Sequence, residues 1–224
     1  MANASNSGDI DWLIDRLVRL ADSVSERPWV LGISGHAGVG KTALAEGLVR
    51  RWQNAARLET ESCILDFAER SRLNLSGCRL EAHDLVLYSS LIDDLLAGQT
   101  VRFRSYDWQS RARTGEWVDK SLPANGILIL DGTILPHPTI ATRCNKVLFL
   151  KPANYRAWLG FAVNRDSRER FRSRRVATLE NKLKYLDTSR IEESFRFNIS
   201  DIIVVSVGSD KSSSQTLEFT IQEP

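Results

Sequence analysis

A glycine-rich stretch near the start of the chain carries the residue types that bind phosphate. Its sequence, GHAGVGKT at positions 35–42, fits the Walker A pattern G-x-x-x-x-G-K-[ST]. Glycines let the backbone curl so that successive N–H groups point at phosphate oxygens, and a helix that opens at the lysine aims its positive end at the same anion. In this pattern Lys41 reaches the β- and γ-phosphates, and the Thr42 hydroxyl is a ligand of Mg²⁺. The stretch therefore predicts a site for ATP and Mg²⁺.

The surroundings of the loop support this prediction. An apolar run, Trp29–Ile33, precedes the loop, and a segment with helical spacing, Lys41–Trp52, follows it, as the motif requires. His36 stands at a variable position of the motif, where a spectator role is expected rather than a catalytic one. The residues that we expect to bind the nucleotide here are Gly35, His36, Ala37, Gly38, Val39, Gly40, Lys41, Thr42 and Ala43.

Two aspartates follow segments that we interpret as buried strands. Ser62–Leu65 ends at Asp66, and Gly126–Leu130 ends at Asp131. Because ligands bind beyond the carboxyl ends of strands in open parallel sheets, both carboxylates are expected beside the loop. Asp66 would orient an acceptor hydroxyl or accept its proton, the alternative being a helix cap. Asp131 would hold Mg²⁺ through water, the alternative being a turn residue.

Positive charge concentrates in one segment, 165–175, with the sequence RDSRERFRSRR. Most runs of this kind are solvated helix faces, and some bind nucleic acid. Above a phosphate site, however, arginines can close over a triphosphate and neutralise the charge of the transferring group. Both interpretations stay open on the residues alone.

The remaining segments alternate between helical and strand patterns. We expect helices over 10–24, 81–96, 154–163 and 179–185, strands over 145–150, 202–207 and 217–221, and an irregular hairpin with arms at 101–107 and 115–119. Apolar strands that alternate with helices predict an α/β protein whose mainly parallel sheet is covered on both faces.

The composition limits the classes of function. The chain has 224 residues, 42% of them hydrophobic, and a net charge of +2, which fits one soluble domain with no need for nucleic acid or a membrane surface. Three widely spaced cysteines suggest neither a disulfide framework nor a zinc site, so a reducing cytoplasm is the expected setting. The first residues lack the pattern of a secretory signal, and no apolar run is long enough to span a membrane.

Several short segments match motifs of one known family. They are Ile33–Gly35, Cys63–Asp66, Leu80–Asp84, Gly98–Val101, Tyr106–Arg113, Ile129–Gly132, Asn164–Asp166 and Arg170–Arg172. With the glycine-rich loop, they make the chain resemble the uridine kinase/phosphoribulokinase/pantothenate kinase group of P-loop kinases, and uridine kinases most. The resemblance runs from about residue 31 to 205. The segment Asn145–Leu148 lacks the acid of a guanine-reading motif, which disfavours a GTPase.

The resemblance implies a fold, an activity and a set of site residues. The fold is a single P-loop NTPase domain over 1–224, a three-layer α/β/α structure with a core at about 28–208, a hairpin insertion at about 99–120 and an Arg-rich lid at about 164–176. The activity is transfer of the γ-phosphoryl group of ATP to a hydroxyl of a small molecule. The residues implied are Lys41, Asp66 and Arg165 for catalysis, Arg165 and Arg170 for the nucleotide, Asp66, Tyr106, Arg111 and Arg113 for the acceptor, and Thr42 and Asp131 for the metal.

The chain also departs from the uridine kinase pattern on the acceptor side. Arg111 replaces a histidine that packs on the pyrimidine, Ala68-Glu69 replaces Phe-Tyr, Phe161-Ala162 stands near the place of paired arginines, and Asp131 replaces a glutamate. An anionic or sugar-like acceptor would use Arg111 and Arg113 better than a neutral base. Two alternatives therefore stay open: a kinase of the same fold for a sugar, a pantothenate-like acid or a specialised metabolite, and a nucleotide-binding regulatory module without turnover. Association between copies of the chain also stays open.

Overall fold

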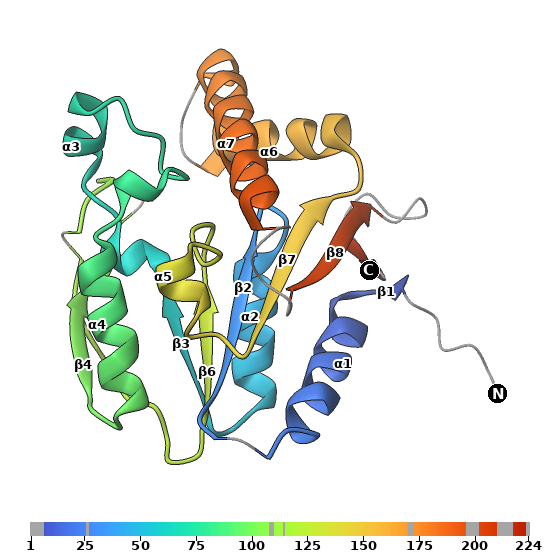
Figure 1. Cartoon of the computed structure of the whole chain (residues 1–224). Coiled ribbons are helices and arrows are strands. Elements are labelled where there is room, and N and C mark those ends of the chain that lie inside the picture. The colour runs from blue at the N-terminus through green and yellow to red at the C-terminus, as the bar shows by residue number, and fades with distance from the viewer. Residues whose placement is uncertain are drawn as a thin grey trace.

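A seven-stranded sheet forms the centre of the molecule (Figure 1), seen in a computed structural model that describes residues 7–25, 27–107, 110–113, 115–169, 173–195, 202–209 and 217–222. The strand order is β1-β9-β8-β7-β2-β6-β3. The five strands from β8 to β3 are parallel. At one edge, β9 pairs antiparallel with β8, and β1 pairs antiparallel with β9. The strands are β1 (Ser7–Gly8), β2 (Trp29–Gly35), β3 (Ala55–Glu59), β6 (Ile127–Asp131), β7 (Lys146–Pro152), β8 (Ile202–Ser209) and β9 (Leu217–Gln222).

Helices cover both faces of this sheet. They are α1 (Ile10–Asp22), α2 (Lys41–Arg51), α3 (Phe67–Arg72), α4 (Leu85–Leu96), α5 (Pro138–Ala141), α6 (Tyr155–Glu169) and α7 (Arg174–Phe195), with short 3-10 turns at Thr60–Cys63 and Leu80–Ala82. One apolar core lies under α1, α2 and α6, and a second lies under α4, α5 and the hairpin. The protein therefore has the predicted three-layer α/β/α architecture.

The central strands are buried because nearly every side chain in them is apolar. All seven residues of β2 and all five of β6 are buried, as expected for parallel strands covered on both faces. In register, Ile33 on β2 faces Asp131 on β6, and Glu59 on β3 also faces Asp131. The carboxyl ends of three strands therefore meet near the glycine-rich loop.

Several boundaries differ from the sequence-based expectation: the helix expected over 179–185 runs over Arg174–Phe195, and two further differences lie near the site. Ser62–Leu65 is not a strand of the sheet: β3 lies earlier, at Ala55–Glu59, and the chain then makes a 3-10 turn before Ile64 forms a single bridge with His83. The predicted strand was misplaced because the apolar run Cys63–Leu65 packs under α4 and α3 instead of pairing in the sheet. The helix predicted from Glu81 begins at Leu85, where Asp84 accepts a hydrogen bond from the Leu87 N–H and caps it.

The predicted hairpin is present as a separate two-stranded sheet. β4 (Val101–Arg104) pairs antiparallel with β5 (Trp117–Lys120), and Val101 and Phe103 turn inward while the alternate residues face solvent. In Figure 1 this hairpin and α4 form the left side of the molecule, and α6 and α7 stand above the strand ends. The hairpin strands thus lie next to α4 at this side of the molecule.

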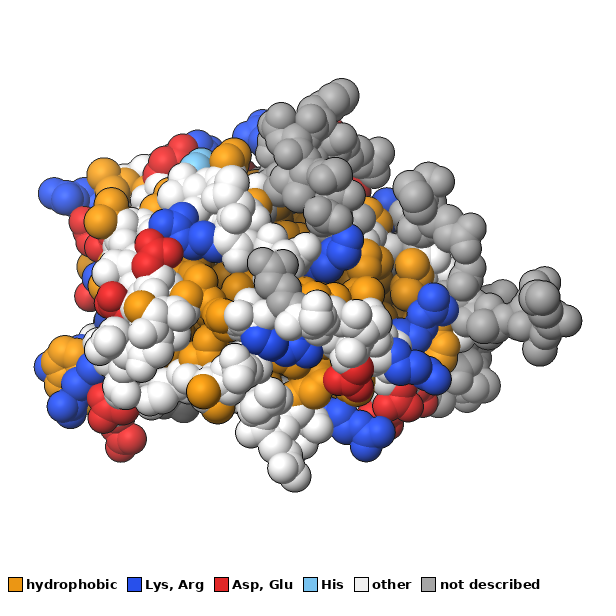
Figure 2. Space-filling view, turned by 60° about the horizontal axis from the view of Figure 1, so that its bottom comes forward, with side chains coloured by type: hydrophobic (Ala, Val, Ile, Leu, Met, Phe, Trp, Pro, Cys, Tyr) orange, Lys and Arg blue, Asp and Glu red, His pale blue; other side chains and the backbone are white. Residues whose placement is uncertain are grey.

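On the face shown in Figure 2, basic and acidic side chains alternate around hydrophobic ones and do not gather into a patch of one sign. Among the residues that the structure describes, no helix combines the length and the apolar character that crossing a membrane requires.

Candidate active site

The glycine-rich loop joins β2 to α2 in a conformation that only glycine adopts easily. Gly35 has φ of 131°, and a Cβ there would lie 2.0 Å from the Leu150 carbonyl oxygen. Gly38 and Gly40 also have positive φ, 78° and 94°. The loop therefore curls closely against β7.

The Lys41 side chain folds back over this loop. Its Nζ donates hydrogen bonds to the carbonyl oxygens of Gly35 (3.1 Å) and His36 (2.8 Å), and it makes no ion pair within the described part of the chain. Burial lowers the pKa of Lys41, and the charge of Asp131 opposes that effect. An enclosed ammonium whose hydrogen-bond partners are all neutral fits a site that receives phosphate.

Thr42 and Asp131 meet as the sequence predicted for a metal site. The Thr42 hydroxyl donates to Asp131 Oδ2 at 3.2 Å, and Arg57 Nη2 donates to the same oxygen at 2.8 Å. The described residues hold no cluster of three or more His, Cys, Asp or Glu side chains that could bind a metal by itself. This donor set fits Mg²⁺, which is commonly held by one or two protein oxygens together with water and substrate phosphate.

A cavity of about 680 Å³ opens in front of the loop. It lies between the loop, the 3-10 turn after β3, α3, the tip of the hairpin and α7. Predicted site residues that line it are Ala37, Gly38, Lys41, Thr42, Arg111 and Arg165. The other described ones, such as Asp66, Tyr106, Arg113 and Asp131, do not line it, and Arg170 lies outside the described residues.

Asp66 ties α3 to the hairpin. It stands at the N-cap position of α3 without capping it through its side chain, and its Oδ1 accepts a hydrogen bond from the Arg113 N–H at 2.8 Å. The next residue, Phe67, donates its N–H to the Arg111 carbonyl at 2.9 Å. The Asp66 carboxylate therefore holds two segments together at the back of the cavity wall.

A different carboxylate, Glu61, faces the cavity beside the loop. It lies in the 3-10 turn, two residues beyond the end of β3, and it lines the cavity with Lys41. Burial, together with the negative charge of Asp131, raises the pKa of Glu61 to about 7. Sequence reasoning missed Glu61 because it placed the strand seven residues too late; a carboxylate just after the weak strand Ala55–Glu59 was the available signal.

Arg70, which the sequence did not single out, lines the cavity. Its Nε donates to the Leu65 carbonyl at 2.9 Å, and its Nη2 donates to the Tyr106 hydroxyl at 2.7 Å. The Arg111 guanidinium stacks over the Phe67 ring, with Cζ 3.0 Å from the ring centroid. Tyr106 therefore contributes by positioning Arg70, while Arg111 lines the cavity directly.

A buried aspartate fixes Arg165 at the loop. The side chain of Asp166 is fully buried and accepts hydrogen bonds from Arg165 Nη2 (2.8 Å), Asn181 Nδ2 (3.0 Å) and Lys184 Nζ (3.4 Å). Arg165 packs so closely on the loop that a Cβ at Gly38 would lie 2.8 Å from its Nη1. This network joins α6 to α7 and places two cations, Arg165 and Lys184, in the cavity lining.

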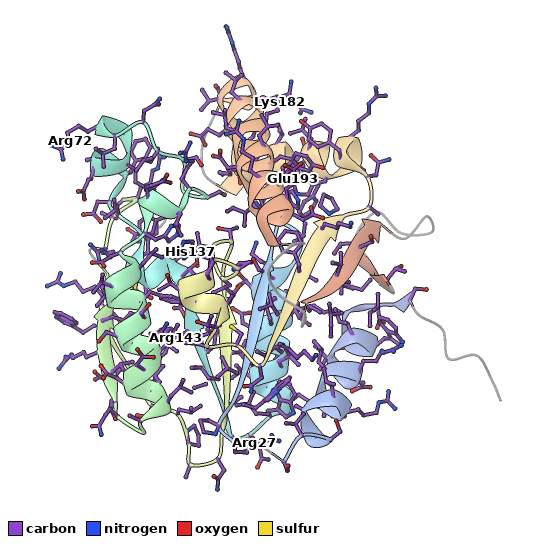
Figure 3. The ribbon with its side chains drawn as sticks, in the orientation of Figure 1. Arg27, Arg72, His137, Arg143, Lys182 and Glu193 are labelled. Atoms are coloured by element: carbon purple, nitrogen blue, oxygen red, sulfur yellow. The ribbon has the colours of Figure 1, made fainter. Side chains whose placement is uncertain are left out.

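Aromatic contacts hold α6 and α7 against the back of the loop. The His36 ring stacks on Tyr185 of α7 at 4.5 Å, and Trp158 of α6 donates its indole N–H to the Ala37 carbonyl at 2.7 Å. Burial lowers the pKa of His36, and the nearby Glu192 carboxylate, 3.9 Å from His36 Nε2, opposes that shift. The structure thus gives the His36 side chain a packing role, behind the cavity. In Figure 3, α7 descends from Lys182 to Glu193 toward the strand ends.

Solved structures with the same arrangement are P-loop kinases. No protein-family model matches the sequence. A fructose transport system kinase candidate from Silicibacter sp. TM1040 superposes with a TM-score of 0.68 at 15% identity, covering 87% of this chain and 98% of the other. The chain has a P-loop kinase fold.

Two further structures agree with this fold. A uridine kinase candidate from Bacillus stearothermophilus gives a TM-score of 0.62 at 16% identity, with 86% of this chain and 96% of the other covered. The D-glycerate 3-kinase of Cryptococcus neoformans gives 0.61 at 11% identity, with 89% and 93% covered. These neighbours agree with the expected uridine kinase-like type of fold, and at these identities the likeness extends to the fold alone.

Proposed function

We propose that the protein is a kinase that transfers the γ-phosphoryl group of ATP to a hydroxyl of a small molecule held in the 680 Å³ cavity. One observation carries this proposal: a single cavity contains both the phosphate-loop lysine, Lys41, and a carboxylate, Glu61, whose pKa is raised to about 7. A binding module needs the first of these groups; a phosphotransferase uses both.

The loop side of the cavity would bind the donor. Backbone N–H groups of the loop and the Lys41 ammonium would contact the β- and γ-phosphates, and Thr42 and Asp131 would hold Mg²⁺. Bound Mg²⁺ supplies positive charge that offsets the charge of the phosphates. Arg165, held by Asp166, lies where it can neutralise charge that develops on the transferring group.

Glu61 would act as the general base. A carboxylate with a pKa near 7 is about half ionised at neutral pH and is basic enough to take a hydroxyl proton. The acceptor oxygen would form a bond to the γ-phosphorus as the bond to the β–γ bridging oxygen breaks, so that ADP leaves and the proton passes to Glu61. We assign to Asp66, which does not line the cavity, the separate task of holding the hairpin to α3.

A pair of isosteric variants tests this assignment. Glu61→Gln removes the base and should lower kcat by about 10²- to 10⁴-fold while ADP binding stays within a few-fold of wild type. Asp66→Asn keeps a hydrogen-bond acceptor for the Arg113 N–H and should lower kcat far less. ADP release would be followed with Mg²⁺, ATP and a panel of nucleosides, sugars and hydroxy acids.

The panel also separates the proposal from its rivals. Turnover with uridine supports a uridine kinase-like activity, and turnover only with another acceptor supports a kinase of the same fold with a different substrate. Wild-type protein that binds ATP but releases no ADP with any acceptor would contradict the proposal in favour of a regulatory module.

A further inference from the structure

Arg70 is a buried cation on the acceptor side of the cavity. Its residue is 6% exposed, it lies on α3, and it lines the cavity. Its hydrogen bonds go to neutral oxygens, the Leu65 carbonyl and the Tyr106 hydroxyl. No carboxylate of the described residues forms an ion pair with it. Burying a charge without a counter-charge is costly, and an anion bound in the cavity would supply the counter-charge that Arg70 lacks.

Two other arginines that line the cavity, Arg79 and Arg190, differ from Arg70. Arg79 forms an ion pair with Glu81 at 3.2 Å, and Arg190 lies 4.0 Å from Asp187. Both therefore have a carboxylate partner within the protein. The contrast indicates that the guanidinium of Arg70 is available to bind an anionic group of a ligand.

The residues around Arg70 leave room for its guanidinium and do not neutralise its positive charge. A Cβ at Gly77 would lie 3.1 Å from Arg70 Nη1, so the glycine makes space for the side chain. Nearby His83 is neutral, because burial lowers its pKa to about 4 and the charge of Arg70 lowers it as well. A neutral His83 therefore gives Arg70 no counter-charge.

We infer that the phosphate acceptor carries its own anionic group, a carboxylate or a phosphate ester, and that Arg70 binds this group. The inference rests on the proposed kinase function and adds the substrate class. Arg70 comes from α3, in the same part of the cavity wall as Phe67 and Arg111, whereas Lys41 and Arg165, the cations assigned to the donor, come from the loop and α6. A cavity of about 680 Å³ suits an acceptor the size of a monosaccharide or a nucleotide.

Matched acceptors that differ only in charge test the substrate class. Glucose, gluconate and glucose 6-phosphate share one skeleton, and uridine and uridine 5′-monophosphate share another. We expect ADP release, or binding to protein saturated with ADP and Mg²⁺, for an anionic member and not for its neutral counterpart. Gluconate and the phosphate esters distinguish a carboxylate from a phosphate as the recognised group.

Arg70→Gln tests the residue, and Arg72→Gln is its matched control. Arg72 lies on the same helix but is exposed and points away from the molecule (Figure 3). Arg70→Gln should raise the Kd or KM for the anionic acceptor roughly 10- to 100-fold, the usual effect of losing a charge-assisted hydrogen bond, with ADP affinity unchanged. Arg70→Lys should recover part of the loss, since it restores the charge, and Arg72→Gln should behave as wild type.

The outcomes separate the two proposals. Turnover of uridine or glucose with a kcat/KM equal to that of their charged counterparts would overturn the inference and leave the kinase function standing. Absence of ADP release with every acceptor would contradict the kinase function, and titration of the ADP-saturated protein would then decide the inference alone. Anions that fail to bind the wild type, or bind folded Arg70→Gln equally well, as judged by its circular dichroism, would refute it.

Discussion

The two sides of the cavity are built in different ways. The proposed donor side is one continuous segment, the loop from Gly35 to Thr42, whose shape depends on its own glycines. The proposed acceptor side is assembled from the 3-10 turn that carries Glu61, from α3 with Arg70, from the hairpin tip with Arg111, and from α7. A local motif can be recognised along the sequence, whereas a wall made of distant segments depends on how they pack.

This difference indicates which side of the cavity can change its substrate specificity. The donor side is constrained by backbone geometry, since a side chain at Gly35 would collide with Leu150. The acceptor side is constrained by side-chain contacts, such as Arg70 with Tyr106, which other residue pairs could replace. Substrate preference can therefore shift among proteins of this fold while the nucleotide loop stays the same.

Of the predictions that follow, the largest effect is expected for Lys41, on the proposed donor side. Lys41→Ala should remove a cation that contacts the phosphates and lower kcat/KM by at least about 10²- to 10³-fold. Lys182→Ala, an exposed lysine on α7 (Figure 3), is the control and should retain wild-type activity. Steady-state ADP release and ADP titration measure both. Full activity in Lys41→Ala would contradict the assignment of Lys41 to the phosphates of the donor.

The stability of the wall formed by α6 and α7 should depend on one buried carboxylate, that of Asp166. Asp166→Ala leaves Lys184 and Arg165 without their shared partner and should destabilise the protein by about 3–5 kcal/mol. The exposed pair of Asp93 with Arg143 provides the comparison, and Asp93→Ala should cost less than about 1 kcal/mol. Urea unfolding measures both; equal losses would show that this wall gains no special stability from Asp166.

Glu61 predicts a pH dependence that belongs to the cavity. Its pKa is raised from 4.5 to about 7, so between these values the folded protein holds a proton that the unfolded chain has released. The contribution of Glu61 to the free energy of unfolding should therefore fall as pH rises through this window. Urea unfolding of ligand-free protein across the window, with Glu61→Gln for comparison, measures it. Identical pH profiles for the two proteins would place the Glu61 carboxyl in water.

The smallest effect concerns the support of the loop. Trp158→Phe removes the indole hydrogen bond to the Ala37 carbonyl and should weaken ADP binding by several-fold, corresponding to about 1 kcal/mol. Trp117→Phe in the hairpin, where the tryptophan is 53% exposed, should leave ADP affinity unchanged. An unaltered affinity in Trp158→Phe would mean that the loop keeps its shape without α6.

Sequence patterns located most of the fold. The strands at β2, β6 and β7 and the hairpin were recognisable because their apolar or alternating residues have a strong and simple period. β3 was not, since Ala55–Glu59 contains only one fully buried residue, Leu58, and the more apolar Cys63–Leu65 nearby gave a stronger signal. The misplaced strand drew attention to Asp66, whereas Glu61, the base proposed above, follows β3.

The sequence by itself determined the phosphate loop, because the needed contacts lie between residues that are neighbours along the chain. It also placed Thr42 and Asp131 together through the rule that parallel strands end at one edge of the sheet. Only the tertiary structure decided that Glu61 and Arg70, rather than Asp66 and Tyr106, line the cavity. The physical reason is that burial and pairing of charges depend on which distant segments pack around them, and no local pattern records that packing.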